Sequence, residues 1–163
     1  MSAVSSDVLN ALSAGINSEI ASYVFYLEAS KKPQAHEIKA VLENLALEEK
    51  KHFQVLERQH NSLIKSEQWI SLADVLKGEH LPEIGEDMAS VHRELIDEVH
   101  KADSIVTVLD IAYRLEEEAY TLFAEQEKVM VSPEGKKVFG ELAKFEQGHM
   151  RQIDQMRQKY ADS

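Results

Sequence analysis

The sequence has no cysteine, and among its 163 residues there are only three prolines and six glycines. Without cysteine the chain can form no disulfide, no cysteine-ligated zinc site, no iron–sulfur cluster and no thiol nucleophile. Proline and glycine interrupt helices more than other residues do, so their scarcity favours long helices. The apolar share of 44% is enough for one globular core.

Positive charge is also scarce, because 18 lysines and arginines stand against 29 acidic residues, a net charge of −11. Nucleic acids and anionic lipids are bound through clusters of basic residues, so we expect neither as a partner. No apolar run approaches the roughly 18–20 residues that span a membrane. Residues 1–7 lack the basic and apolar parts of a secretory signal. These absences predict a soluble, cytoplasmic protein.

The apolar periodicity predicts four long helices and one shorter helix near the middle of the chain. Ser6 or Asp7 is expected to cap the first helix, and Asp103 or Ser104 the third long one. Pro33 is suited to the first turn of the second long helix. Four such helices predict an all-α four-helix bundle with a long, partly helical crossover between the second and third. The predicted ranges are about 7–30, 33–64, 86–101, 103–131 and 133–160.

The two halves of the chain repeat each other at an offset of 97 residues without a gap. We therefore predict a single domain over 1–163, built from two copies of one helical hairpin, about 7–60 and 103–160, joined by a crossover of about 61–102. Two such hairpins can pack with approximate two-fold symmetry, which doubles any site that one hairpin half-builds. The polar and aromatic matches include Glu19 with Glu116, Tyr23 with Tyr120, Glu49 with Glu146, and His52 with His149.

Six ionisable residues interrupt the apolar stripes of the four long helices near mid-length. Four buried carboxylates are very costly without compensating positive charge, and two divalent cations would balance them. The spacing Glu-x-x-His places both side chains on one helix face. Each hairpin supplies one such pair and one lone Glu, the set found in di-iron carboxylate bundles. Carboxylate and imidazole ligands suit iron or manganese. The predicted metal ligands are Glu19, Glu49, His52, Glu116, Glu146 and His149.

Other readings of these polar residues stay open at this point. The buried pairs can instead be hydrogen-bonded Glu–His pairs of an unusual core. A third Glu-x-x-His, Glu57 to His60, has no counterpart at the 97-residue offset and reads as a solvated helix end. Tyr23 and Tyr120 lie one turn beyond Glu19 and Glu116. They are candidates either for a hydrogen bond to a ligand carboxylate or for plain core packing.

Four stretches of the chain resemble the rubrerythrin group of the ferritin-like superfamily. The resemblance extends over nearly the whole chain and is strongest around the two repeat-matched Glu-x-x-His pairs. The stretches are Glu19 followed by Phe25-Tyr26, Leu45–His52 (LALEEKKH), Ala112–Glu116 followed by Leu122-Phe123, and Leu142–His149 (LAKFEQGH).

The resemblance implies a ferritin-like bundle that holds two iron ions. The chemistry of the ligands leaves manganese or a mixed iron–manganese pair as alternatives. Glu49 and His52 would lie on one side and Glu146 and His149 on the other, with bridging roles shared among the carboxylates. The family's activities are reduction of hydrogen peroxide, reaction with dioxygen, and ferrous oxidation. Rubrerythrins proper carry a cysteine-containing rubredoxin module, which this chain lacks, so peroxidase turnover would need an external electron donor. Many also carry a further Glu where this chain has Ala119.

Three functional hypotheses follow from the sequence. The first is a peroxidase- or ferroxidase-type oxidoreductase whose catalytic groups are the metal ligands themselves. The second is a non-catalytic protein that binds, stores or delivers iron, and the third is a bundle with a vestigial site. We also expect a homo-oligomer, and the apolar face of residues 88–99 is suited either to an oligomer contact or to covering the bundle.

Overall fold

The computed structural model describes residues 5–32, 36–77 and 81–161. In these residues every regular element is an α-helix, and no helix is long and apolar enough to cross a membrane. The elements are α1 (Ser6–Ser30), α2 (His36–Ser66), α3 (Leu72–Lys77), α4 (Glu86–Ser90), α5 (Arg93–Lys101), α6 (Ile105–Val129) and α7 (Pro133–Tyr160).

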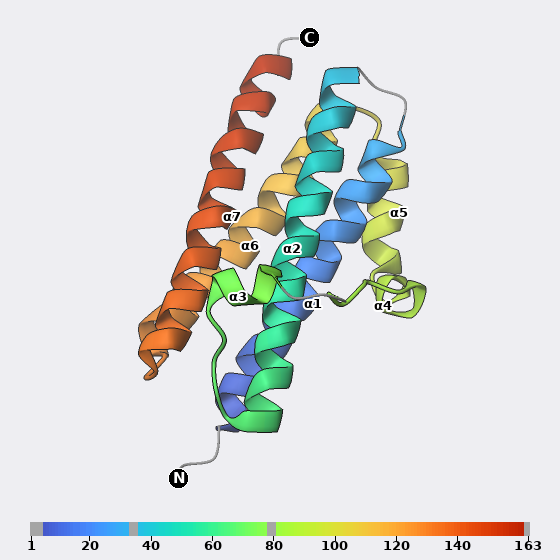
Figure 1. The fold of residues 1–163 in the computed structure, drawn as a ribbon. Helices are drawn as coiled ribbons and strands as arrows, with labels where there is room; N and C mark the ends of the chain where they lie inside the picture. The colour runs from blue at the N-terminus through green and yellow to red at the C-terminus, as the bar shows by residue number, and fades with distance from the viewer. Residues whose placement is uncertain (1–4, 33–35, 78–80, 162–163) are drawn as a thin grey trace.

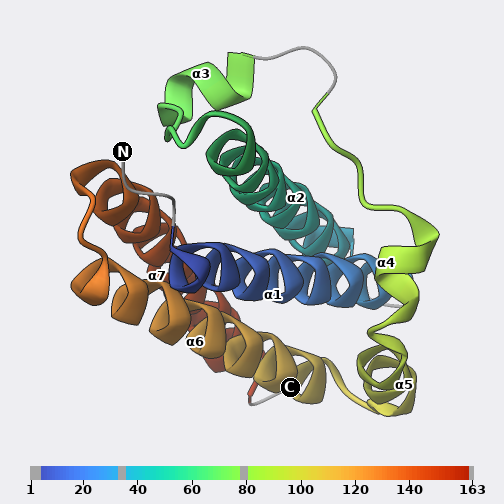
Figure 2. The same ribbon diagram turned by 90° about the horizontal axis from the view of Figure 1, so that it is seen from below.

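The four long helices form a bundle of two hairpins, α1 with α2 and α6 with α7 (Figures 1 and 2). The two hairpins meet mainly where α1 lies against α6. The long crossover passes beside the first hairpin, with α3 against α2 and with α4 and α5 against α1. The predicted all-α ferritin-like architecture is confirmed.

Three of the long helices start with the same serine cap. The hydroxyl of Ser5 accepts a hydrogen bond from the backbone N–H of Val8 at 3.3 Å, and Ser104 and Ser132 do the same for the residue three positions on. Each cap satisfies one backbone donor of the first turn. The cap of α1 is therefore Ser5 and not the predicted Ser6 or Asp7. Pro33, predicted to open the second helix, lies outside the described residues.

The predicted single helix over 86–101 is wrong, because the crossover bends there into the two shorter helices α4 and α5. His92 leaves the helical region at φ −99° and ψ 32° and becomes the residue before α5. The bend splits the expected apolar face. Leu95 and Val99 are buried against the bundle, whereas Val91 is 73% exposed. The ammonium group of Lys32 holds α5 in place by donating to the carbonyl oxygens of Val99 and Ala102 at 2.8 and 2.9 Å.

The hydrophobic core consists of two main clusters, one on each side of the polar level. One cluster contains Phe25, Leu45 and Leu109, and the other contains Leu12, Phe139 and Leu142. On each long helix the predicted ligands come between the segment that joins the first cluster and the segment that joins the second. The fold therefore encloses the six polar side chains in apolar material above and below.

Candidate metal centre

The structure brings all six predicted ligands together at one level of the bundle. All four long helices contribute, because the repeat places a lone Glu on α1 and α6 and a Glu-x-x-His pair on α2 and α7. The four carboxyl side chains are fully buried, and the two imidazoles are at most 7% exposed. The residues are Glu19, Glu49, His52, Glu116, Glu146 and His149.

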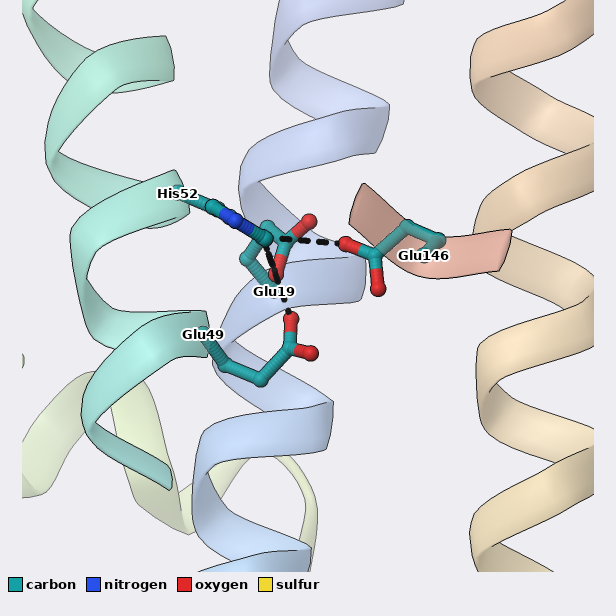
Figure 3. A group of neighbouring side chains, drawn as sticks. All are labelled: Glu19, Glu49, His52 and Glu146. Atoms are coloured by element: carbon teal, nitrogen blue, oxygen red, sulfur yellow. Dashed lines mark hydrogen bonds and ion pairs between the residues drawn. The ribbon is translucent and has the colours of Figure 1, made fainter. Parts of the chain in front are cut away.

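The six side chains form two overlapping groups of four, each with ligand atoms within 4.8 Å of one another. In the first group Glu19 and His52 join Glu49 and Glu146, as Figure 3 shows. In the second group Glu116 and His149 join the same two carboxylates. We call these the His52 position and the His149 position. Since Glu49 and Glu146 belong to both, they are placed to bridge two cations.

Both imidazoles point their Nδ1 atoms at the carboxylates. Nδ1 of His52 lies 3.1 Å from Oε1 of Glu146 and 3.6 Å from an oxygen of Glu49. Nδ1 of His149 lies 2.8 Å from Oε1 of Glu49 and 3.4 Å from oxygens of Glu116 and Glu146. The two rings are nearly parallel, with centroids 5.8 Å apart. Nitrogen and oxygen lone pairs from both hairpins thus converge on the interior.

Several of these buried atoms have no hydrogen-bond partner among the described residues. They include both oxygens of Glu19, both oxygens of Glu49 and Nδ1 of His149, which approaches Glu49 closely without forming a hydrogen bond. Buried polar atoms are rarely left unpaired, because such an atom loses its hydrogen bonds to water and gains none in the protein. Atoms that are unpaired, buried and convergent are what a metal ion needs from its ligands, so the donor set fits two divalent cations.

The pKa values of the four carboxyl groups separate into two classes. Burial, and then repulsion from the neighbouring carboxylates, raises the pKa of Glu19 and Glu116 well above the usual range. Burial acts in the same direction on Glu49 and Glu146. There, interactions with other carboxyls and with the two imidazoles outweigh burial and lower the pKa. When no metal is bound, the two carboxylates shared by both positions therefore favour the ionised form more than Glu19 and Glu116 do.

The two imidazoles carry the balancing charge. Burial lowers the pKa of His52, but its interactions with Glu146 and Glu49 outweigh this and raise it to about 9. The same carboxylates, with Glu116, raise the pKa of His149 further. Without metal, two imidazolium rings thus face two carboxylates while two carboxyl groups stay neutral. In the metal-free site, bound protons thus balance the negative charge that two divalent cations would balance in the filled site.

This charge arrangement predicts that metal binding releases protons. A metal-bound imidazole is neutral and a metal-bound carboxylate is ionised, so two divalent cations should displace about four protons at neutral pH. Isothermal titration calorimetry with Co²⁺ in buffers of different ionisation enthalpy measures this number directly. Binding without net proton release would show that the metal-free site is not protonated in this way.

Two side chains that the sequence did not single out hold the ligands from outside. The buried hydroxyl of Tyr26 donates to Oε1 of Glu116 at 2.5 Å, and burial together with that carboxyl raises the pKa of Tyr26, so the hydroxyl keeps its proton. Oε2 of Glu48 lies 2.5 Å from Nε2 of His149. In the sequence, Tyr26 and Glu48 stand only within stretches that resemble the family. Both contacts cross between the hairpins, so helical periodicity does not reveal them.

The two tyrosines that were candidates either for a hydrogen bond to a ligand carboxylate or for core packing lie in the core. Tyr23 and Tyr120 are half-buried and pack against the hydrophobic clusters, and no hydrogen bond from either to a ligand is present in the described structure. Glu117 and Glu118, which follow Glu116 in the sequence, are exposed, because the helix turns each successive side chain by about 100°. His60 belongs to neither group of candidate ligands among the described residues.

Comparison with known proteins gives one family match. The family model Rubrerythrin matches residues 10–156, which include all six candidate ligands and most of both hairpins. No curated protein and no solved structure is similar enough to the chain to count as a match.

Proposed function

Because the chain belongs to the rubrerythrin family, we propose that it is a di-iron oxidoreductase that reduces hydrogen peroxide or reacts with dioxygen. The observation that carries the proposal is the buried set of four carboxyls and two imidazoles with unpaired atoms. Two ferrous ions held by these residues would supply two electrons, which together with two protons would reduce hydrogen peroxide to two molecules of water. An external donor would return the electrons, because the chain has no cysteine for a rubredoxin centre.

Glu19 and His52 would hold one ion, Glu116 and His149 the other, and the bridging carboxylates both. The four carboxylates together carry a charge of −4. Two divalent cations would balance that charge, so the filled site would be neutral overall. The apolar clusters on either side keep bulk water away from this level, which strengthens the electrostatic interactions within it. The Tyr26 hydroxyl holds a proton at Oε1 of Glu116, and Glu48 orients the ring of His149.

The first test is metal content by elemental analysis of protein purified without chelators. Anaerobic loading with Fe²⁺ then prepares the reduced protein for titration with hydrogen peroxide and, separately, with dioxygen. We expect about two irons per chain and fast oxidation by one equivalent of peroxide per pair of irons. The Glu146→Ala variant, which lacks a ligand common to both positions, serves as the matched control and should not react.

The outcomes separate the candidate activities. Faster reaction with dioxygen than with peroxide would assign the chain to ferroxidase or oxidase chemistry. Retention of many irons per chain would favour storage. If reconstituted Fe²⁺ survives both oxidants unchanged, the proposed oxidoreductase is wrong.

A further inference from the structure

The two metal positions differ in the residues that support their ligands. At the His149 position, Tyr26 donates to Glu116 and Glu48 contacts the outer nitrogen of His149. The 97-residue repeat places Phe123 and Phe145 at the corresponding places for the His52 position. The ligands follow the internal symmetry of the chain, but the residues that support them do not. Both supporting residues act at the His149 position, and both of their counterparts are phenylalanine.

The supporting carboxylate is well placed to act on His149. The side chain of Glu48 is 41% exposed and reaches His149 from the neighbouring hairpin, and the amide of Asn44 lies 3.4 Å from its other oxygen. A carboxylate on the far nitrogen of a metal-bound imidazole fixes its tautomer and orientation and makes it a stronger ligand. With Nε2 donating to Glu48, Nδ1 of His149 is free to bind a cation.

The His52 position lacks this support. The ring of Phe145 lies 5.2 Å from the ring of His52, and in the described structure no carboxylate comes within ion-pair distance of the outer nitrogen of His52. Phe123 packs against α1 near Gly15, one turn from Glu19, and neither oxygen of Glu19 has a hydrogen-bond partner among the described residues. The phenyl ring of phenylalanine has no oxygen that could accept a hydrogen bond from an imidazole and no hydroxyl that could orient a carboxylate.

We propose that the two positions bind divalent cations unequally, with the His149 position filling first and the His52 position holding the exchangeable ion. This inference rests on the proposed metal centre and adds an order of filling to it. It also identifies Glu48 and Tyr26 as positioning residues, which act on the metal through His149 and Glu116. A mixed-metal pair would then have its second element at the His52 position.

The test is a Co²⁺ titration of metal-free, full-length protein, followed by calorimetry and visible absorption. We expect two binding steps whose dissociation constants differ by at least about 10-fold. Glu48→Gln keeps the side-chain shape and should weaken the first step by roughly 10–100-fold while leaving the second step unchanged. Glu43→Gln removes an exposed carboxylate of α2 that pairs with Lys39, and it should change neither step.

A converse variant and a spectroscopic readout locate the first ion. Phe145→Glu places a carboxylate beside His52 and should tighten the second step toward the first. With one equivalent of Co²⁺, the proton spectrum should show one hyperfine-shifted, exchangeable ring N–H, which should exchange faster with solvent in Glu48→Gln. His52→Ala should keep the first step and lose the second.

Each remaining outcome bears on a different claim. Two equal steps in the wild type, or equal weakening of both steps by Glu48→Gln, would overturn the unequal positions and leave the di-iron proposal standing. Loss of the first step in His52→Ala would reverse the assigned order. If no Co²⁺ binds at all, both this inference and the proposed metal centre are wrong.

Discussion

We expect the Glu49→Ala variant to lose both metal ions, whereas His52→Ala keeps one. Glu49 belongs to both groups of four ligands, and His52 belongs to one. Elemental analysis of protein purified in parallel should show about two ions per chain in the wild type, one in His52→Ala and none in Glu49→Ala. Such a pattern is expected only if a single carboxylate serves both positions.

The charge balance of the core explains the size of this effect. Four carboxylates neutralise two divalent cations, so removal of one bridging carboxylate leaves an unpaired positive charge in a fully buried site. An uncompensated buried charge costs far more than the lost metal–ligand contact alone. The remaining carboxylate that spans both positions, Glu146, cannot offset that charge.

The control for this experiment is Glu43→Ala, which removes an exposed carboxylate from the same helix and should retain both ions. Circular dichroism of each variant in the metal-free form shows whether the bundle is still folded. Two ions retained by a folded Glu49→Ala protein would contradict a bridging role for Glu49.

The second large effect concerns stability, which should depend strongly on bound metal. An ion that binds only the folded chain stabilises it by about 4 kcal/mol at a free concentration of roughly 1,000 times its dissociation constant. Two ions under that condition contribute about 8 kcal/mol, which in a domain of this size corresponds to a rise in Tm of roughly 15–30 °C. Scanning calorimetry of chelator-treated and Co²⁺-loaded protein measures the difference.

The structure gives a reason for the low stability expected of the metal-free form. Its core contains four carboxyls and two imidazoles, with several unpaired atoms enclosed between apolar clusters. Metal binding offsets the free-energy cost of desolvating these groups. When a chelator removes the metal, that cost again lowers the stability of the fold. Glu49→Ala provides the control, because its Tm should not respond to added Co²⁺. Equal Tm values for the loaded and the chelator-treated wild type would show that bound metal does not contribute to the stability of the bundle.

Much of the fold could be predicted because the local signals agree with one another. The long helices follow from apolar periodicity and from serine caps such as Ser104 and Ser132. Scarce proline and glycine leave few alternatives to helix. The crossover was harder, since the 3.6-residue period continued through Val91 and His92 although the backbone turns there. Of the expected apolar face, only Leu95 and Val99 pack against the bundle, and Met88 remains exposed.

By itself the sequence determined the six candidate ligands and their common level, because helical spacing and the 97-residue repeat are properties of the chain. Only the tertiary structure decided which residues support those ligands. Tyr26 reaches Glu116 across 90 positions and Glu48 reaches His149 across 101, each from one hairpin to the other. A period along one helix says which face is buried, but it does not say which side chain of another helix packs against that face. The inequality of the two metal positions arises at those contacts.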